Sequence, residues 1–387
     1  MRKWFRIAGF TTLALCLVAA AVAFYKRDEI QRLWAVNTLF DADHIVHNFS
    51  NMDAAFLTAP LDRGSALTSE LPQGPDMVLP DTVAQWIEER SVTSLLVLKE
   101  GETRHESYHL GTEESDLRVS WSVAKSYLSV LFGILLSEGK IASLDDEVVA
   151  YAPSLRGTAY DGATLRNVLN MASGVAFDED YLDYDSDINR MGRELALGGT
   201  LDGFTANLND TVAEPGTEWR YVSMDTHVLG MVIRGATGET VPALLSDRVM
   251  QHLGLEQSGH YLTDGAGVAF VLGGINQTTR DFARFGLMVA QDGQFAGKQI
   301  APKDWIAQST RPSAPTAEGK AGYGFQWWIP RNAQPGEFLA RGVYGQYIYI
   351  DQGRDVVIVV TAADRGFRKP GVSQQNISML RTLAQSL

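Results

Sequence analysis

Residues 119–128 read VSWSVAKSYL and place Ser122 three positions ahead of Lys125 at the start of a long apolar segment. The apolar positions of this segment predict a largely buried helix. Residues three apart share one face of a helix, so this serine and lysine should meet if the helix begins at or just before the serine. A second Ser-x-x-Lys pair, Ser137 and Lys140, is expected to be separated, because the glycine between them ends the helix.

Ser122 and Lys125 have the chemistry of a nucleophile and its base. Burial among apolar side chains lowers the pKa of a lysine from its reference of about 10.4, because it disfavours the charged amine. A neutral amine beside a hydroxyl can act as a general base, and free N–H groups at a helix N-terminus can stabilise an acyl oxyanion. The alternative is a helix-capping serine, which is common at a helix start but leaves Lys125 unexplained.

A Ser-His-Asp triad is the competing arrangement. The chain has no Gly-x-Ser-x-Gly sequence, which removes the usual strand-turn-helix form of that triad. His227 is expected to pack within the apolar segment DTHVLGMVI. Two histidine pairs, His44 with His47 and His105 with His109, have spacings that a metal could use, but neither has a clear third ligand nearby. We therefore expect no metal and no cofactor.

Charge and cysteine content narrow the possible partners. The formal charge of −13 at pH 7 would on average repel a nucleic acid or an anionic lipid surface. Cys16 is the only cysteine and lies in the N-terminal apolar run, so the remainder of the chain has no disulfide and no thiol nucleophile. The expected partner is a small molecule, and the sequence does not indicate the oligomeric state.

Residues 1–24 combine a basic start with a long apolar run, and Lys26 and Arg27 follow directly. This pattern predicts either a cleaved signal peptide or a retained membrane anchor, with any membrane contact through residues 7–24. In both cases the rest of the chain is expected outside the cytoplasm, either free in the periplasm or tethered to the inner membrane.

The remaining chain divides into an N-terminal arm, residues 25–75, and one main domain, residues 76–387. Two apolar runs around KEGE predict an early β-hairpin, and strand patterns return late in GYGFQWWIP and in GVYGQYIYIDQGRDVVIVVTA, a second hairpin around Gln352-Gly353. The middle, about 140–290, favours helices, and SQQNISMLRTLAQSL predicts a C-terminal helix. The expected fold is α+β, with an antiparallel sheet flanked by helices and a mainly helical subdomain.

Several motifs occur in an order that resembles one known superfamily. They are Ser122-x-x-Lys125, LRNVLNMASGV, Tyr221-x-Ser223 in place of a more frequent Tyr-x-Asn, GGINQTTRDFARFG, GYGFQWW and GVYGQYIYI. Over residues 76–387 the chain resembles the serine β-lactamase and penicillin-binding-protein superfamily. Within it, the similarity is to the class C-like branch that includes esterases and 6-aminohexanoate-dimer hydrolases.

The resemblance implies a β-lactamase/transpeptidase-like fold and a set of roles. It implies that Ser122 is the acylated nucleophile, that Lys125 is its base, and that Tyr221 passes a proton to the leaving atom and later activates water. The backbone N–H groups of Ser122 and Val343 would form the oxyanion hole. A buried Tyr221 that only packs remains the alternative.

The resemblance also implies substrate-binding residues and one departure. Tyr181, Ser223, Gly342 and Tyr344 are the implied binding residues, with Tyr181 contacting the leaving amine unless it is merely an exposed loop aromatic.

The departure falls at the Lys-Thr-Gly motif, which maps onto Ala340-Arg341-Gly342. Ala340 cannot present a cation to a substrate carboxylate, and Arg341 should point to the opposite face of a strand.

The sequence thus predicts an exported serine hydrolase that cleaves a small ester or amide through an acyl-enzyme. A D-amino peptidase or weak β-lactamase of the same fold is the first alternative. A penicillin-recognising sensor or binding protein that acylates without turnover is the second.

Overall fold

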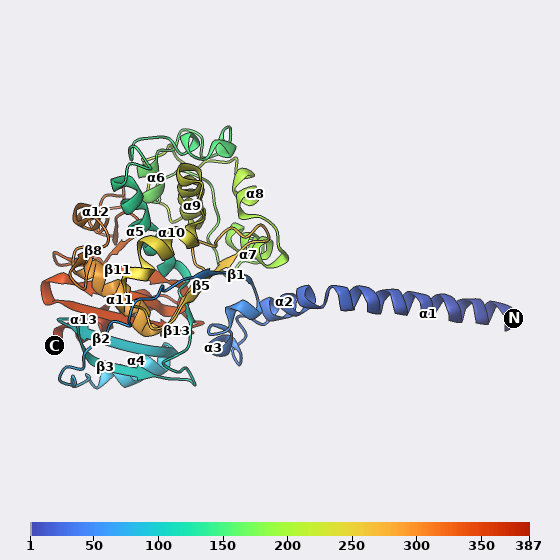
Figure 1. The fold of residues 1–387 in the computed structure, drawn as a ribbon, viewed down its shortest axis with the longest axis horizontal. Coiled ribbons are helices and arrows are strands. Elements are labelled where there is room, and N and C mark those ends of the chain that lie inside the picture. Colours follow the sequence, from blue (N-terminus) through green and yellow to red (C-terminus); the bar gives the residue numbers. More distant parts are fainter. Residues whose placement is uncertain (1) are drawn as a thin grey trace.

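The computed structural model describes residues 2–387, with side chains from residue 10 onward except those of residues 28 and 29. The main body has a sheet half and a helical half, and a helix extends away from the body at the N-terminus (Figure 1). The α+β prediction is confirmed.

The central sheet joins strands from both ends of the chain. Its order is β3-β2-β13-β12-β11-β10-β9, and every neighbouring pair is antiparallel. The strands are β2 (Val92–Lys99), β3 (Glu102–Tyr108), β9 (Gly322–Tyr323), β10 (Trp328–Ile329), β11 (Glu337–Gly342), β12 (Gln346–Asp351) and β13 (Val356–Ala362). Both predicted hairpins, β2-β3 and β12-β13, are present, and β2 pairs with β13 to bring the chain ends together.

Helices cover both faces of this sheet, which explains why the central strands β2 and β13 are buried along almost their whole length. On one face α4 (Thr82–Glu89) and the predicted C-terminal helix α13 (Val372–Gln385) pack against alternate residues such as Leu95 and Val97. On the other face α5 (Ala124–Ser137) and α11 (Thr279–Ala290) pack against the intervening residues such as Leu96 and Leu98.

Most of the helical half lies between β3 and β9 in the chain. Its helices are α6 (Leu165–Leu169), α7 (Asp187–Leu197), α8 (Leu201–Ala206), α9 (Ser223–Thr237), α10 (Val241–Arg248) and α12 (Lys303–Ser309). It also carries a second antiparallel sheet, β1-β5-β6-β4, made of β1 (Leu57–Leu61), β4 (Arg118–Val119), β5 (Gly259–Thr263) and β6 (Ile275–Gln277), and a small hairpin of β7 (Gln294–Phe295) and β8 (Lys298–Gln299). The sequence pattern did not predict these short strands.

The N-terminal arm packs on the body at two places. Strand β1 pairs with β5 over its whole length, from Leu57 opposite Thr263 to Leu61 opposite Gly259. Upstream, α2 (Arg27–Asn37) lies beside α7, and α3 (Ile45–Asn48) buries Ile45. The arm is therefore part of the folded body.

Helix α1 (Arg2–Tyr25) projects away from the body, and its apolar side chains from Phe10 to Phe24 are mostly exposed (Figure 1). The basic side chains predicted to begin this segment, Arg2, Lys3 and Arg6, lie outside the described side chains. Among the described residues no single helix is long and apolar enough to cross a membrane. Two bent pairs meet the length and composition test, Phe10–Tyr25 with Ile30–Asn37 and Ser223–Thr237 with Val241–His252.

Candidate active site

The backbone holds Ser122 and Lys125 on one side of a continuous helical stretch. A short 3₁₀ turn, η2 (Trp121–Val123), runs directly into α5, and side chains three apart eclipse one another in such a turn. Trp121 has a φ of 43°, a left-handed conformation that is costly for a large side chain and clusters at functional sites. Neither helix start has a side-chain cap, so Ser122 does not serve as the N-cap that the alternative interpretation required.

The second Ser-x-x-Lys pair is separated as predicted. Helix α5 ends at Ser137, and Gly139 follows with a φ of 71°. The Ser137 hydroxyl donates to its own helix, to the carbonyl oxygen of Ile134 at 2.7 Å, while Lys140 is exposed.

Lys125 is buried, with only 1% of its surface exposed. Its Nζ donates to Thr226 Oγ1 at 3.2 Å and lies 3.5 Å from the Ser223 carbonyl oxygen. Thr226 in turn donates to Gln326 Oε1 at 2.8 Å, and Gln326 is fixed by donating to two carbonyls of the α6 turn. Burial lowers the pKa of Lys125 from 10.5 to about 7, so near neutral pH much of the amine has a free lone pair.

Two carboxylates flank this amine, the half-buried Glu179 and the buried Asp225, and the sequence analysis did not identify either of them. Glu179 accepts hydrogen bonds from the backbone N–H of Ser223 and from the Tyr181 hydroxyl, the latter at 2.9 Å. Asp225 accepts from Ser173 Oγ at 2.7 Å and from the Tyr160 hydroxyl at 2.9 Å.

Burial raises the pKa of Glu179 and raises that of Asp225 to about 7, whereas their attraction to Lys125 acts in the opposite direction. Both carboxylates therefore favour the protonated form of Lys125 electrostatically, and its desolvation outweighs them.

Tyr221 stands over Lys125 at the edge of the site. The lysine Nζ lies 5.3 Å from the centroid of its ring, which also stacks on Trp328 with centroids 5.5 Å apart. Burial and the nearby Glu179 raise the pKa of the phenol, while Ser122 and Arg341 act in the opposite direction. Tyr221 thus keeps its proton near neutral pH, which suits a group that donates to a leaving atom.

The end of β11 closes the site opposite Ser122. A Cβ at Gly342 would lie 2.7 Å from the Ser120 carbonyl oxygen and 3.1 Å from the Ser122 nitrogen, so only glycine allows this approach. The next residue, Val343, lines the same space as Ser122. The two backbone groups predicted for an oxyanion hole are therefore brought to one place.

Arg341 places a cation at the space that Ser122 lines. The predicted alternation holds, since Ala340 is buried against the helical core and Arg341 lies on the other face. Because β11 ends at the site, the guanidinium nevertheless reaches it and lies 5.3 Å from the Trp328 ring centroid. Strand alternation alone did not indicate that the side chain would reach the site from that face.

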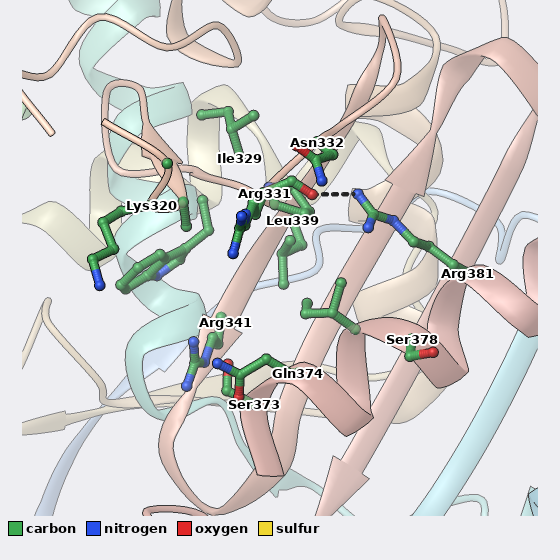
Figure 2. A pocket seen from close by; sticks show the side chains of 15 residues that line it. Lys320, Ile329, Arg331, Asn332, Leu339, Arg341, Ser373, Gln374, Ser378 and Arg381 are labelled. Carbon is green, nitrogen blue, oxygen red and sulfur yellow. Dashed lines mark hydrogen bonds between the residues drawn. The ribbon is translucent and has the colours of Figure 1, made fainter. Parts of the chain in front are cut away.

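We call the space around Arg341 the cationic cleft. It has a volume of about 450 Å³ and includes Ser122, Tyr221, Arg341, Arg368 and Lys369 among its lining residues. A neighbouring cavity of about 470 Å³ shares Arg341, Trp328 and two residues of α13 with it, and adds further basic side chains, Lys320, Arg331 and Arg381. Figure 2 shows these basic groups around the neighbouring cavity, with Arg341 beside Ser373 and Gln374.

A second space, the apolar cleft, opens on the other side of Ser122. It has a volume of about 430 Å³, and predicted binding residues Tyr181, Ser223 and Tyr344 line it. Tyr181 is half-buried and borders both clefts, which excludes its interpretation as an exposed loop aromatic. Tyr344 stacks on Phe40 of the arm with ring centroids 5.1 Å apart.

The histidines lie apart from this site. His227 is buried in α9 and contacts Asp202 through Nε2 at 2.8 Å. His105 and His109 both contact the Ser107 hydroxyl. Within residues 10–27 and 30–387, no group of three or more histidine, cysteine, aspartate or glutamate side chains could hold a metal ion.

Comparison with known proteins agrees with this geometry. The sequence profile of the family described as Beta-lactamase matches residues 83–375. The chain belongs to the β-lactamase family. It is 30% identical over 325 residues to the 6-aminohexanoate-dimer hydrolase of Paenarthrobacter ureafaciens, which covers 80% of each chain.

Solved structures place the fold in the same group. A Bacillus anthracis protein with a provisional assignment as a 6-aminohexanoate-dimer hydrolase superposes with a TM-score of 0.81 at 23% identity, covering 90% of this chain and 95% of that one. EstCE1, a hydrolase with promiscuous acyltransferase activity, gives a TM-score of 0.60 at 18% identity, over 77% of this chain and 96% of that one. The protein is a β-lactamase-related serine hydrolase with the predicted fold.

Proposed function

We propose that this enzyme cleaves a small ester or amide through an acyl-enzyme on Ser122. The observation that carries the proposal is the buried Lys125, whose pKa of about 7 makes it a base beside a serine at the junction of two clefts. Thr226 and Gln326 fix the orientation of its amine, and the serine one helical turn earlier lines both clefts.

In the acylation step, Ser122 Oγ attacks the substrate carbonyl carbon and its proton passes to Lys125 Nζ. The carbonyl oxygen becomes an oxyanion stabilised by the N–H groups of Ser122 and Val343. The bond from carbon to the leaving oxygen or nitrogen then breaks, and Tyr221 donates its proton to that atom. The Lys125 proton replaces the one lost by Tyr221.

Deacylation repeats these transfers with water. Tyr221 and Lys125 together accept a proton from a water molecule as its oxygen attacks the acyl carbon. The bond to Ser122 Oγ breaks, the serine recovers a proton, and the carboxylic acid leaves. Each turnover consumes one water and returns both side chains to their starting protonation states.

The cationic cleft favours a leaving group with a polar or negatively charged end. Arg341 borders this cleft together with Arg368 and Lys369, and the chain as a whole is acidic. Substrates with a carboxylate therefore remain candidates, and a D-amino peptidase or weak β-lactamase activity is the second proposal, favoured by Arg341.

The test uses a fluorophosphonate probe and a chromogenic ester with the full-length protein. Ser122→Ala should abolish both labelling and turnover, whereas Ser137→Ala, which alters the exposed end of the same helix, should change neither. Labelling that survives in Ser122→Ala and disappears in Ser137→Ala would refute the assignment. A stable adduct on Ser122 without turnover of any ester or amide would indicate a sensor in place of a hydrolase.

We further propose that the domain functions outside the cytoplasm. The exposed apolar side chains of α1 and the charges that follow it, Lys26 and Arg27, support this proposal. Protease added to bacterial spheroplasts that express the full chain should digest the domain, while a cytoplasmic marker stays intact. Protection of the domain under these conditions would contradict export.

A further inference from the structure

The two clefts beside Ser122 differ in composition, and Tyr221 borders only one of them. It lines the cationic cleft and is absent from the lining of the apolar cleft. A proton donor must lie next to the atom that leaves. If Tyr221 is that donor, as in the proposed function, the leaving group occupies the cationic cleft. The acyl group, on the other side of the same carbonyl carbon, then lies in the apolar cleft.

The walls of the apolar cleft come from three separate parts of the chain. Helix α7 contributes Ile188 and Met191, the second sheet and its following loop contribute Leu262 and Leu272, and the N-terminal arm contributes Leu39 and Phe40. All of these except Phe40 are buried. These buried side chains give the cleft apolar walls. Apolar walls favour the binding of a hydrocarbon group, because that group is transferred out of water.

Two polar side chains of α7 that line this cleft are already engaged elsewhere. Arg193 donates to the Tyr184 carbonyl oxygen and lies 4.0 Å from the centroid of the Tyr184 ring. Asn189 donates to three carbonyl oxygens of the preceding loop. Neither group needs a polar partner from a substrate. The unpartnered polar atoms of the lining, Ser223 Oγ and Trp121 Nε1, belong to residues beside the catalytic centre, so the part of the cleft along α7 offers little to a polar or charged acyl group.

We propose that the apolar cleft is an acyl subsite for an unbranched hydrocarbon chain, so that the preferred substrates are medium-chain acyl esters or amides. This inference rests on the proposed function and adds its substrate class. The acyl carbonyl lies at Ser122, the chain runs between α7 and the arm, and the polar leaving group lies toward Arg341. A substrate of this kind is amphiphilic.

Gly192 gives a direct way to test the subsite. It lies on α7 at the lining of the apolar cleft, and a Cβ placed there would meet no atom within 4 Å. A larger side chain at this position therefore projects into open space, and replacing a helical glycine also removes its conformational cost. Both variants, Gly192→Leu and Gly192→Ala, should fold. The leucine should shorten the cleft, and the alanine should shorten it less.

The experiment measures kcat/KM for 4-nitrophenyl acetate, butyrate and octanoate with the full-length protein. In the wild type, kcat/KM should rise by about four-fold for each added methylene until the cleft is filled, the factor expected for a buried CH₂. Gly192→Leu should lower kcat/KM for octanoate by about ten-fold or more and affect acetate far less, with Gly192→Ala between the two.

The outcomes separate the subsite from the mechanism. A wild type that hydrolyses acetate through Ser122 with no dependence on chain length would overturn the acyl subsite and leave the proposed function intact. An equal loss on acetate and octanoate in Gly192→Leu would also overturn it. Hydrolysis of acetate that persists in Ser122→Ala would refute the proposed function itself.

Discussion

Replacing Lys125 by methionine should abolish turnover and at the same time stabilise the fold. The side chain is buried, and its pKa falls from 10.5 in the unfolded chain to about 7 in the folded one. At pH 7 the lysine is fully protonated in the unfolded chain and about half protonated in the folded one. Burying this amine therefore lowers the free energy of unfolding by roughly 4 kcal/mol. Methionine has a similar length and no such cost.

The net gain is smaller because Glu179 and Asp225 lose a nearby cation in the variant. Replacing buried charges by apolar groups of similar volume is often neutral or stabilising by about 1–4 kcal/mol, and we expect Lys125→Met to fall in that range at pH 7. The size of this gain depends on pH. Above pH 7 the unfolded lysine binds a proton that the folded lysine lacks, so the wild type gains stability as the pH rises toward 10.5.

Urea denaturation of the two proteins measures this effect. The stability advantage of Lys125→Met should shrink by about 1.4 kcal/mol between pH 8 and pH 9. In parallel, kcat/KM of the wild type should rise with pH to a plateau with an apparent pKa near 7 that belongs to the coupled Lys125 and Tyr221 pair. A variant that is less stable than the wild type at pH 7, or a stability difference that does not change with pH, would refute the interpretation that Lys125 is a buried amine with a lowered pKa.

Two further substitutions test the proton donor and the oxyanion hole. Tyr221→Phe should lower kcat/KM for amides by about 10²-fold or more and spare activated phenyl esters, whose leaving groups depart without protonation. The control is Tyr323→Phe, which changes a buried ring that contacts Tyr221. Equal losses on both substrate types in Tyr221→Phe would exclude Tyr221 as the proton donor. Gly342→Ala should push β11 away from Ser122, because its Cβ would lie 2.7 Å from the Ser120 carbonyl oxygen, and should lower kcat by about 10²-fold, the scale of a lost oxyanion donor. Unchanged turnover in Gly342→Ala would show that the end of β11 does not form the oxyanion hole.

Local patterns in the sequence determined much of the fold. The apolar positions after Trp121 identified α5, and the glycine after it separated Ser137 from Lys140. The early hairpin followed from the glycine of KEGE, since Glu100 and Gly101 both have positive φ and close a tight turn. Such signals are readable because helix periodicity, strand periodicity and turn chemistry act over a few neighbouring residues.

Only the tertiary structure decided which polar groups meet around Lys125. Glu179 belongs to an acidic loop segment, FDEDYLDYDSD, in which nothing distinguishes it from its solvated neighbours. Asp225 and Gln326 are likewise inconspicuous until α9 and the turn before β10 are packed against α5. Arg341 lies on the strand face that alternation predicts, but alternation does not show that the strand ends at the cleft, where the guanidinium reaches the site. These contacts join residues far apart in the chain, and their energies depend on burial and distance, which no local pattern encodes.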